Sequence, residues 1–88
     1  MKYEFCWTPA ARRALRAIPQ RDAIRLLTAL AMLGDDPYRR DEVDVKALTG
    51  RSGFRLRVGN YRLIYDVDDG KLIILVIAAG HRRDIYDN

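Results

Sequence analysis

The sequence has few residues that could bind a metal or form a disulfide. Its 88 residues include one cysteine, Cys6, and one histidine, His81. A single thiol cannot form an internal disulfide, and one cysteine with one histidine cannot supply the four ligands of a structural zinc site. We therefore expect no disulfide, no metal and no cofactor. Because Cys6 lies in an apolar run, we expect it to be a buried structural thiol.

Long hydrophobic runs are also missing. No stretch of 18 or more apolar residues occurs, and residues 1–4 lack the apolar core of a signal peptide. The protein is therefore expected to be soluble and cytoplasmic, with no membrane partner. A chain of this length buries too little surface for two cores, which predicts a single domain over residues 1–88.

Lysine is scarce, whereas arginine is abundant. The formal net charge of +4 arises from 13 arginines and 3 lysines against 12 acidic residues. The planar guanidinium group suits bidentate recognition of phosphate, so a nucleic acid is one candidate partner. A solvated positive surface is the alternative, because basic charge alone does not identify a ligand.

The N-terminal part predicts a strand followed by two helices. Residues 2–7 alternate weakly and are rich in aromatic side chains, which is typical of a strand. The pair Thr8-Pro9 predicts the start of a helix that ends near Ala17, and a second helix follows from about Arg21 to Leu33, capped by Gly34. The two helices are expected to form an antiparallel pair on one face of a sheet. The expected core residues of the second helix are Ile24, Leu27, Leu30, Ala31 and Leu33.

The first helix carries three outward arginines. Its inward stripe at helical spacing is Ala11, Ala14, Leu15 and Ile18. This spacing directs Arg12, Arg13 and Arg16 outward. They form either a solvated face or a contact surface for a nucleic-acid backbone.

Residues 35–49 are predicted to form a loop that can include a short extended piece from Val43 to Leu48. Asp41, Glu42 and Asp44 form an acidic cluster within it. Nothing in an exposed loop would raise the pKa of such a carboxyl group into the range useful for acid–base catalysis. We therefore expect a structural or solvating role for all three.

Residues 53–65 contain two alternating runs joined by Gly59-Asn60, the pattern of a two-residue hairpin with a primed turn. One face of this hairpin is apolar or aromatic, and the other carries Arg55, Arg57 and Arg62. Arg57 is expected directly opposite Arg62, where like charges repel and cost stability. This placement favours an anionic ligand on that face.

A second hairpin is predicted at Asp69-Gly70, followed by an apolar strand from Leu72 to Ala79. Carrying the alternation across this turn places Arg62 opposite Ile77. It also places His81 on the face that carries the hairpin arginines. The residues then expected in the helix-facing core are Leu72, Ile74, Val76 and Ala78.

A basic site with one histidine and one tyrosine fits the chemistry of RNA cleavage. Attack of a ribose 2′-OH on the adjacent phosphate needs a base for that hydroxyl, cations for the developing charge and an acid for the 5′-oxygen. His81 is a candidate for proton transfer because histidine titrates near neutral pH, whereas arginine can stabilise charge but does not readily accept a proton. Tyr86 can stack a base, or it can simply pack at the end of the sheet.

Three segments resemble a known toxin family. They are Leu48-Thr49-Gly50, the hairpin from Phe54 to Tyr65, and the stretch from Gly80 to Tyr86. Together with the order of a strand, two helices and three strands, they resemble a RelE-type toxin of the RelE/ParE superfamily over nearly the whole chain. The resemblance implies an α+β fold, β-α-α-β-β-β, with the helix pair packed on one face of an antiparallel-dominated sheet.

The resemblance also implies the toxin of a type II toxin–antitoxin module, which enters the ribosomal A site and cleaves mRNA there without a metal. The implied partners are a cognate antitoxin, RelB-like or other, the ribosome with its mRNA, and operator DNA only through the antitoxin complex. By position, Arg62 resembles the family's phosphate-stabilising arginine. Arg82 resembles the arginine assigned to charge stabilisation or leaving-group protonation, and Tyr86 the tyrosine that orients or stacks the substrate.

One departure from the family pattern affects the base. Arg55 and Arg57 occupy the positions of two lysines in the best-known member, one of them a proposed base. His81 is therefore our candidate base on chemical grounds. The residues expected to bind RNA or phosphate are Arg55, Arg57, Lys46 and Arg83.

Two other functions remain open. A ParE-like toxin would poison DNA gyrase through protein contact, and a degenerate toxin would act only as a binding module. ParE-like chains generally lack an ending with His81-Arg82 and Tyr86, so this ending favours the nuclease. An apolar strip at Ile64, Ile73 and Leu75 could dock the antitoxin, although the N-terminal strand or the tail could cover it, and the antitoxin could instead wrap the helices.

Overall fold

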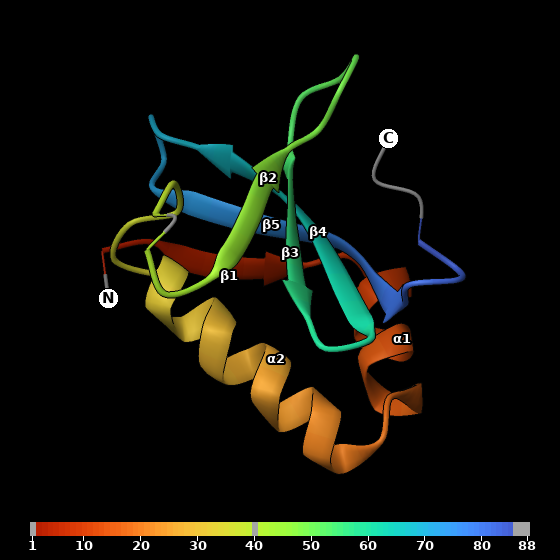
Figure 1. The fold of residues 1–88 in the computed structure, drawn as a ribbon. Helices are drawn as coiled ribbons and strands as arrows, with labels where there is room; N and C mark the ends of the chain where they lie inside the picture. Colours follow the sequence, from red (N-terminus) through yellow and green to blue (C-terminus); the bar gives the residue numbers. More distant parts are fainter. Residues whose placement is uncertain (1, 40, 86–88) are drawn as a thin grey trace.

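The computed structural model describes residues 2–39 and 41–85, which form a five-stranded sheet with two helices on one face (Figure 1). The elements are β1 (Glu4–Trp7), α1 (Pro9–Ala17), α2 (Gln20–Leu33), β2 (Asp44–Ala47), β3 (Phe54–Val58), β4 (Tyr61–Asp68) and β5 (Ile73–His81). The predicted α+β class and element order are confirmed. The sheet has one strand more than the expected pattern, because the short extended piece in the acidic loop pairs with β3 as β2.

Both helices begin and end close to where the sequence signals predict. The Thr8 side chain accepts a hydrogen bond from the Ala11 N–H at 3.1 Å, and Pro9 occupies the first turn of α1. α2 ends at Leu33, and the Gly34 N–H bonds to the Ala31 carbonyl. α1 packs on β5 and α2 on β3 and β4, so the helices spread apart across the sheet instead of lying side by side (Figure 1).

The buried face of α2 differs from the predicted one. Its buried residues are Leu26, Leu30 and Leu33, whereas Ile24 and Leu27 are 54% and 40% exposed. Apolar residues occur on every side of this helix, so periodicity alone could not determine its rotation. The row at i, i+4 and i+7 faces the sheet, and an apolar stripe faces outward.

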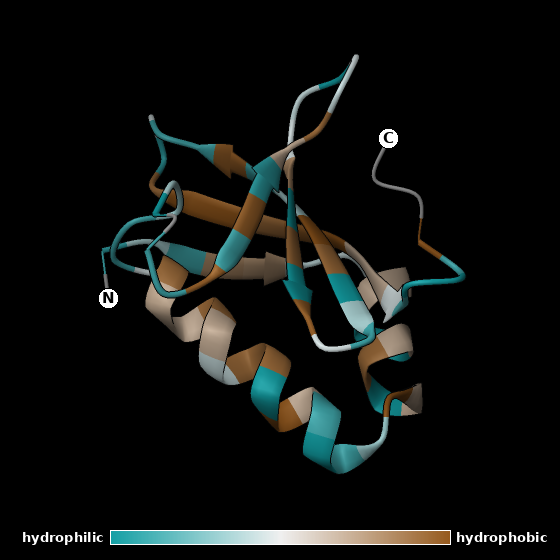
Figure 2. Cartoon of the chain, viewed as in Figure 1, coloured by the Kyte–Doolittle hydropathy of each residue, from teal (hydrophilic) through white to brown (hydrophobic). Residues whose placement is uncertain are grey.

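The sheet order is β1-β5-β4-β3-β2, with β1 parallel to β5 and all other neighbours antiparallel. Hydrophobic residues concentrate along β4 and β5 in the middle of the sheet (Figure 2). Among the largest fully buried side chains are Leu26, Leu33, Leu56, Leu63, Tyr65, Ile74 and Val76. No helix in the described ranges is long and apolar enough to cross a membrane.

The β3–β4 hairpin has the predicted register. Val58 lies opposite Tyr61, and Arg57 lies opposite Arg62. Gly59 has a φ of +59°, the left-handed value required at the first position of a type II′ turn, where glycine is strongly preferred. The local turn signal was sufficient because a two-residue loop determines the pairing of both strands.

The predicted β4–β5 register is wrong. Asp68 pairs with Ile73, so the loop has four residues and includes Leu72 in a left-handed conformation at φ 55°. Further along, Tyr65 pairs with Val76 but Ile64 pairs with Ala78, which makes Ile77 the extra residue of a β-bulge. A one-residue shift exchanges the two faces of the strand for every residue beyond it.

The bulge changes which residues face the helices. Ile74 and Val76 lie in the core as predicted, but after the bulge Ala79 occupies the core and Ala78 does not. Cys6 lies opposite Leu75 on the far side and is exposed, so the prediction of a buried thiol is wrong.

The predicted apolar strip is only partly exposed. Ile64 is buried between Arg55 and Ala78 on the neighbouring strands. Ile73 is half-buried, and Leu75 is 39% exposed.

The Asp69 carboxylate, in the loop between β4 and β5, connects three segments of the chain. Asp69 accepts hydrogen bonds from the hydroxyls of Tyr3 and Tyr38, each at 2.5 Å. The bond to Asp69 raises the pKa of Tyr38 to about 12 and also raises that of Tyr3, while the two hydroxyls lower the pKa of Asp69. The Tyr65 hydroxyl donates to the Pro37 carbonyl at 2.6 Å and fastens the same loop to the core.

Candidate RNA-binding face

The side of the sheet away from the helices carries a charged surface, here called the arginine face. Strand pairing places its members in two rows, one from Asp44 through Arg57 and Arg62 to Gly80, and one from Lys46 through Arg55 to Ile64. Cross-strand partners share a face, so these side chains emerge on the same side. The predicted gathering of Arg55, Arg57 and Arg62 on one face follows from this register.

Asp44 links two of these arginines. Its Oδ1 accepts from the Arg55 Nη2 at 2.8 Å, and its Oδ2 lies 2.8 Å from Arg57 Nε and 2.7 Å from Arg57 Nη2. The Arg55 side chain is only 9% exposed, whereas that of Arg57 is about half exposed. The Arg55 side chain is therefore largely buried, whereas the Arg57 side chain presents its charge to solvent.

Sequence reasoning missed the role of Asp44, which it treated as one of three solvating carboxylates. The signal was present: Asp44 and Lys46 alternate in the same way as Arg57 and Arg55 on the strand opposite. Asp41 and Glu42 instead form exposed ion pairs with Arg39, at 3.1 and 3.8 Å. Only the pairing of β2 with β3 separates the three carboxylates into two environments.

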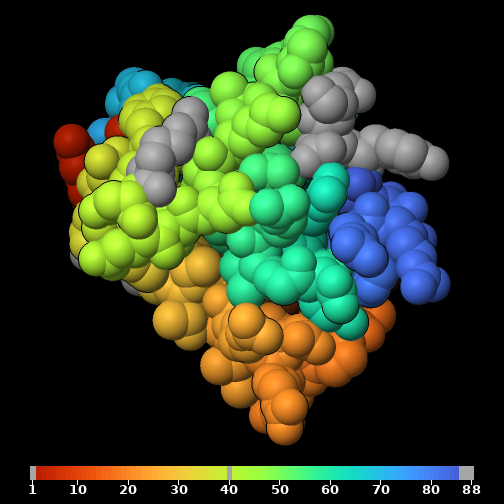
Figure 3. Space-filling view, viewed as in Figure 1, coloured from red at the N-terminus to blue at the C-terminus, as the bar shows by residue number. Residues whose placement is uncertain are grey.

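The residues after β5 lie beside Arg62. The Arg82 N–H donates to the Asn60 carbonyl at 2.8 Å, which extends the β4–β5 ladder past its last pair. A Cβ on Gly80 would lie 3.4 Å from Ile85, so the tail passes over the sheet at the position opposite Arg62. Figure 3 shows this tail, in blue, beside the β3–β4 hairpin.

His81 is not on the arginine face, and the predicted placement is wrong. It pairs with Tyr61 on the helix side, where the two rings meet edge to face with centroids 5.5 Å apart. Its Nδ1 accepts a hydrogen bond from the Arg83 N–H at 3.2 Å. The bulge at Ile77 causes the change, because it reverses the alternation before His81.

The pocket beside His81 is a separate hollow of about 300 Å³ between the end of β5 and α1. It is lined by Ala14, Ala17, Ile18, Tyr61, Ala79, Gly80, His81 and Asp84.

The other predicted site residues are placed as follows. Lys46, Arg82 and Arg83 are exposed, and Tyr86 lies outside the described residues. Across the described ranges, no group of three His, Cys, Asp or Glu side chains could hold a metal ion.

The arrangement can bind and stabilise negative charge. Arg57 and Arg62 are direct cross-strand neighbours, and Arg82 follows on the adjoining strand end. Charges fixed in advance stabilise a developing anion without a reorganisation cost at the moment of reaction. Sheet pairing and the Asp44 carboxylate hold part of this arrangement in place.

The chain is similar to toxins of bacterial and archaeal toxin–antitoxin systems. Residues 6–86 match a family described as the ParE toxin of the type II toxin–antitoxin system parDE. The chain is 33% identical to Toxin RelG of Mycobacterium tuberculosis over 98% of both chains. These matches cover nearly the entire sequence.

Solved structures of similar proteins share the fold. The RelE–RelB complex from Pyrococcus horikoshii contains a chain with a TM-score of 0.81 and 28% identity, covering 93% of this chain and 97% of that one. The RelBE2 toxin–antitoxin complex from Mycobacterium tuberculosis contains one with a TM-score of 0.77 and 29% identity, covering 93% and 100%.

Proposed function

The chain belongs to the RelE/ParE superfamily of type II toxins, and from this premise we propose that it is a ribosome-dependent endoribonuclease that cleaves mRNA. The observation that carries the proposal is the cross-strand pair of Arg57 and Arg62, with the tail that begins at Arg82 beside it. Such a row of positive charge, held by strand pairing, suits stabilisation of a reacting phosphate. We further propose a cognate antitoxin as the partner that keeps the toxin inactive, with operator DNA bound only through that complex.

In the proposed reaction, the 2′-oxygen attacks the adjacent phosphorus and the bond to the 5′-oxygen breaks. The 2′-hydroxyl gives its proton to solvent water, and the 5′-oxygen takes up a proton as it leaves, so the numbers of protons lost and gained by the RNA balance. Arg57 and Arg62 stabilise the charge that develops on the phosphate oxygens, and Arg82 does so from the tail or donates a proton to the leaving oxygen. Arg stabilisation of this kind contributes about 10²–10³ in rate for each well-placed donor.

Four other residues have supporting roles in the proposal. Asp44 holds Arg57 at the surface and keeps Arg55 in a fixed position beneath it. Lys46 and Arg83 are exposed and extend the positive charge along the bound strand. Tyr86 is proposed to orient or stack a base, as the family resemblance implies.

His81 supports the tail in this proposal and is not assigned as the base. Its Nδ1 already receives the Arg83 N–H, and its ring lies across the sheet from Arg62. Holding the Arg83 N–H shapes the turn that carries Arg82. His81 therefore acts on the reaction through the position of the tail.

Primer extension on translating mRNA after induction of the toxin tests the proposal. We expect new 5′ ends within codons at the ribosomal A site, and none when translation is blocked before induction. Gyrase-dependent breaks in DNA would instead establish a ParE-like function. This alternative is tested because the matching family is described as a ParE toxin. Growth arrest with neither kind of break would establish a binding module.

A further inference from the structure

The side of the sheet that carries the arginine face also carries a group of carboxylates. Toward the opposite corner of that side, the last residues of β4 pair with the first residues of β5, and these in turn pair with β1. Cross-strand partners share a face, and alternation along β4 puts Asp66 and Asp68 on the same side as Arg62. We call this region the acidic corner, and its residues are Glu4, Cys6, Asp66, Asp68, Ile73 and Leu75.

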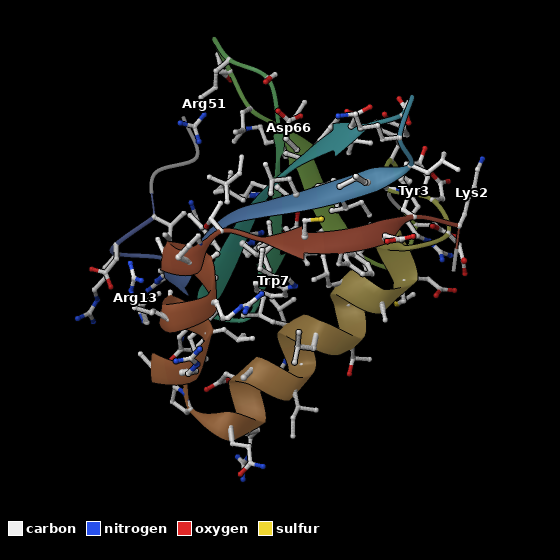
Figure 4. All side chains as sticks on the ribbon, turned by 180° about the vertical axis from the view of Figure 1, so that it is seen from behind. Lys2, Tyr3, Trp7, Arg13, Arg51 and Asp66 are labelled. Atoms are coloured by element: carbon white, nitrogen blue, oxygen red, sulfur yellow. The ribbon has the colours of Figure 1, made fainter. Side chains whose placement is uncertain are left out.

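The three carboxylates of the acidic corner keep their negative charge uncompensated. Among the described residues, none of the three forms a salt bridge. Their hydrogen-bond donors are uncharged, namely a hydroxyl at 3.0 Å and backbone N–H groups at 2.8 and 3.0 Å. Lys2 and Lys71 lie nearby in the sequence without pairing with them, and the Lys2 Nζ lies 5.9 Å from the centroid of the Tyr3 ring (Figure 4).

Exposed apolar side chains accompany these carboxylates. Leu75 is 39% exposed, and Ile77, the bulge residue two positions further along β5, is 37% exposed. Cys6 on the neighbouring strand is exposed as well. Exposed apolar surface rimmed by charge commonly marks an interaction site.

The diagonally opposite corner of this side is basic, and we call it the basic corner. Arg57 and Arg62 are cross-strand neighbours there, and Asp44 is bonded to Arg57. Lys46 and Arg82 are exposed and add further positive charge. Positive charge is therefore in excess at this corner.

β4 runs from one corner to the other. The residues that it places on this side are, in order, Arg62, Ile64, Asp66 and Asp68. The sign of the charge therefore reverses across Ile64, which is buried. The two corners are diagonally opposite because β2 and β3 adjoin the start of β4, whereas the start of β5 and all of β1 lie beside its end.

A second copy of the chain matches both corners at once. A two-fold axis between two facing sheets, along the diagonal that separates the corners, places the basic corner of each copy on the acidic corner of the other. Every favourable contact then occurs twice, as two-fold symmetry requires. The strands of the two copies cross at about 90°, which is one of the two usual arrangements of packed sheets.

Other partners match only half of this side. RNA pairs with the basic corner but is repelled by the carboxylates, and a basic protein has the reverse preference. Two copies satisfy both corners, and Leu75 and Ile77 add apolar contact. The net charge of +4 on each copy opposes their approach, so we expect a weak dimer in exchange with the monomer.

We propose that a second copy of this chain docks on this side of the sheet, with the basic corner of each copy against the acidic corner of the other. The dimer covers Arg57 and Arg62, so RNA and the second copy compete for the same arginines. The dimer is therefore a form of the chain that cannot reach an RNA substrate. Self-association is independent of the proposed function, and only its consequence for cleavage rests on that function.

Sedimentation equilibrium of the purified chain tests the contact. The weight-average mass of the wild type should rise with concentration from 10.2 kDa toward twice that value. Arg57→Glu and Glu4→Arg each place like charges against one another across the interface, and each should weaken dimerisation by about tenfold or more. Arg21→Glu is the matched control, because it makes the same change of charge on an exposed position of α2, and it should weaken dimerisation by less than about twofold.

Association between two different variants is the sharper test. When Glu4→Arg meets Arg57→Glu, both two-fold contacts again join opposite charges. Labelled Glu4→Arg should therefore bind Arg57→Glu at least as tightly as the wild type binds itself, and should bind Arg21→Glu more weakly. Thermal melts establish that each variant is folded. If Arg57→Glu is not, Lys46→Glu replaces it, because the Lys46 side chain has no hydrogen bond or salt bridge to a described residue.

The outcomes separate this inference from the proposed function. A wild type that remains at 10.2 kDa at every concentration overturns the inference, and so does a dimer that none of the charge changes weakens. A single-stranded RNA oligonucleotide should dissociate the dimer, and RNA bound to an intact dimer would likewise overturn the inference. A dimer that responds as expected, in a chain that does not cleave translating mRNA, would refute the proposed function and leave the inference standing.

Discussion

Two arginine clusters among the described residues are held in very different ways. On the arginine face, a carboxylate of the chain itself bonds to Arg55 and Arg57, and strand pairing determines their spacing. On α1, Arg12, Arg13 and Arg16 have no such carboxylate among the described residues. The first arrangement is typical of charge organised in advance for a reaction, and the second of charge that awaits a partner. The two clusters thus suit catalysis and docking respectively.

The largest effect is expected for Arg62→Ala combined with Arg82→Ala. This variant removes two charges that we propose stabilise the reacting phosphate, so cleavage should fall by about 10³-fold or more, with loss of growth arrest. Arg12→Ala combined with Arg16→Ala removes the same charge from α1 and should leave cleavage within about threefold of wild type. Circular dichroism and antitoxin binding of the first variant should match wild type. Full toxicity of the first variant would refute the site assignment.

A smaller effect on cleavage is expected at His81. The His81→Asn side chain can still accept the Arg83 N–H through its amide oxygen, whereas His81→Ala cannot. If His81 only positions the tail, the Asn variant should cleave within about threefold of wild type and the Ala variant about tenfold more slowly. An equal, large loss in both variants, with loss of the acidic limb of the pH–rate profile, would identify His81 as a proton-transfer group after all.

Stability should respond to Asp44 but not to the arginines on α1. Asp44→Asn removes the carboxylate that bonds to buried Arg55 and exposed Arg57. Because the Asp44 side chain is 42% exposed, the free energy of unfolding should fall by only about 2 kcal/mol. Arg12→Ala should change it by less than about 0.5 kcal/mol. Urea denaturation of both variants measures the difference, and equal values would remove the contrast between the clusters.

The smallest expected effect is on the pH dependence of stability, and it arises from Tyr38, which belongs to neither arginine cluster. Folding raises the pKa of Tyr38 from 10.0 to about 12 through its bond to Asp69. This contribution to stability is therefore complete below about pH 10 and is lost as the pH rises toward 12. Urea midpoints should fall over that range, and they should fall less in Tyr38→Phe. An unchanged slope in this variant would show that other groups dominate.

Much of the scaffold could be predicted because its signals are local. Thr8 and Pro9 determine where α1 begins, and Gly59 allows the turn that sets Arg57 opposite Arg62. In each case the decisive atoms lie within a few residues of one another. All three arginines of the arginine face lie on this one hairpin.

The remaining features depend on contacts between distant segments. The rotation of α2 is determined by which leucines fit against β3 and β4, because apolar residues surround that helix. The bulge at Ile77 moves His81 to the helix side, although the strand that contains it is uniformly apolar and carries no marker of the extra residue. A uniformly apolar segment therefore predicts a strand but does not predict its register.

The sequence by itself determined the fold class, the bounds of α1 and the opposed pair of Arg57 and Arg62, since these follow from capping, turn chemistry and period-two alternation. Only the tertiary structure decided that Asp44 holds Arg55 and Arg57, that His81 supports the tail from the other side, and that an acidic corner shares one side of the sheet with the arginines. The physical reason is that each of these features joins residues far apart in the chain. Their meeting is determined by how helices and strands pack, and not by the pattern within any one of them.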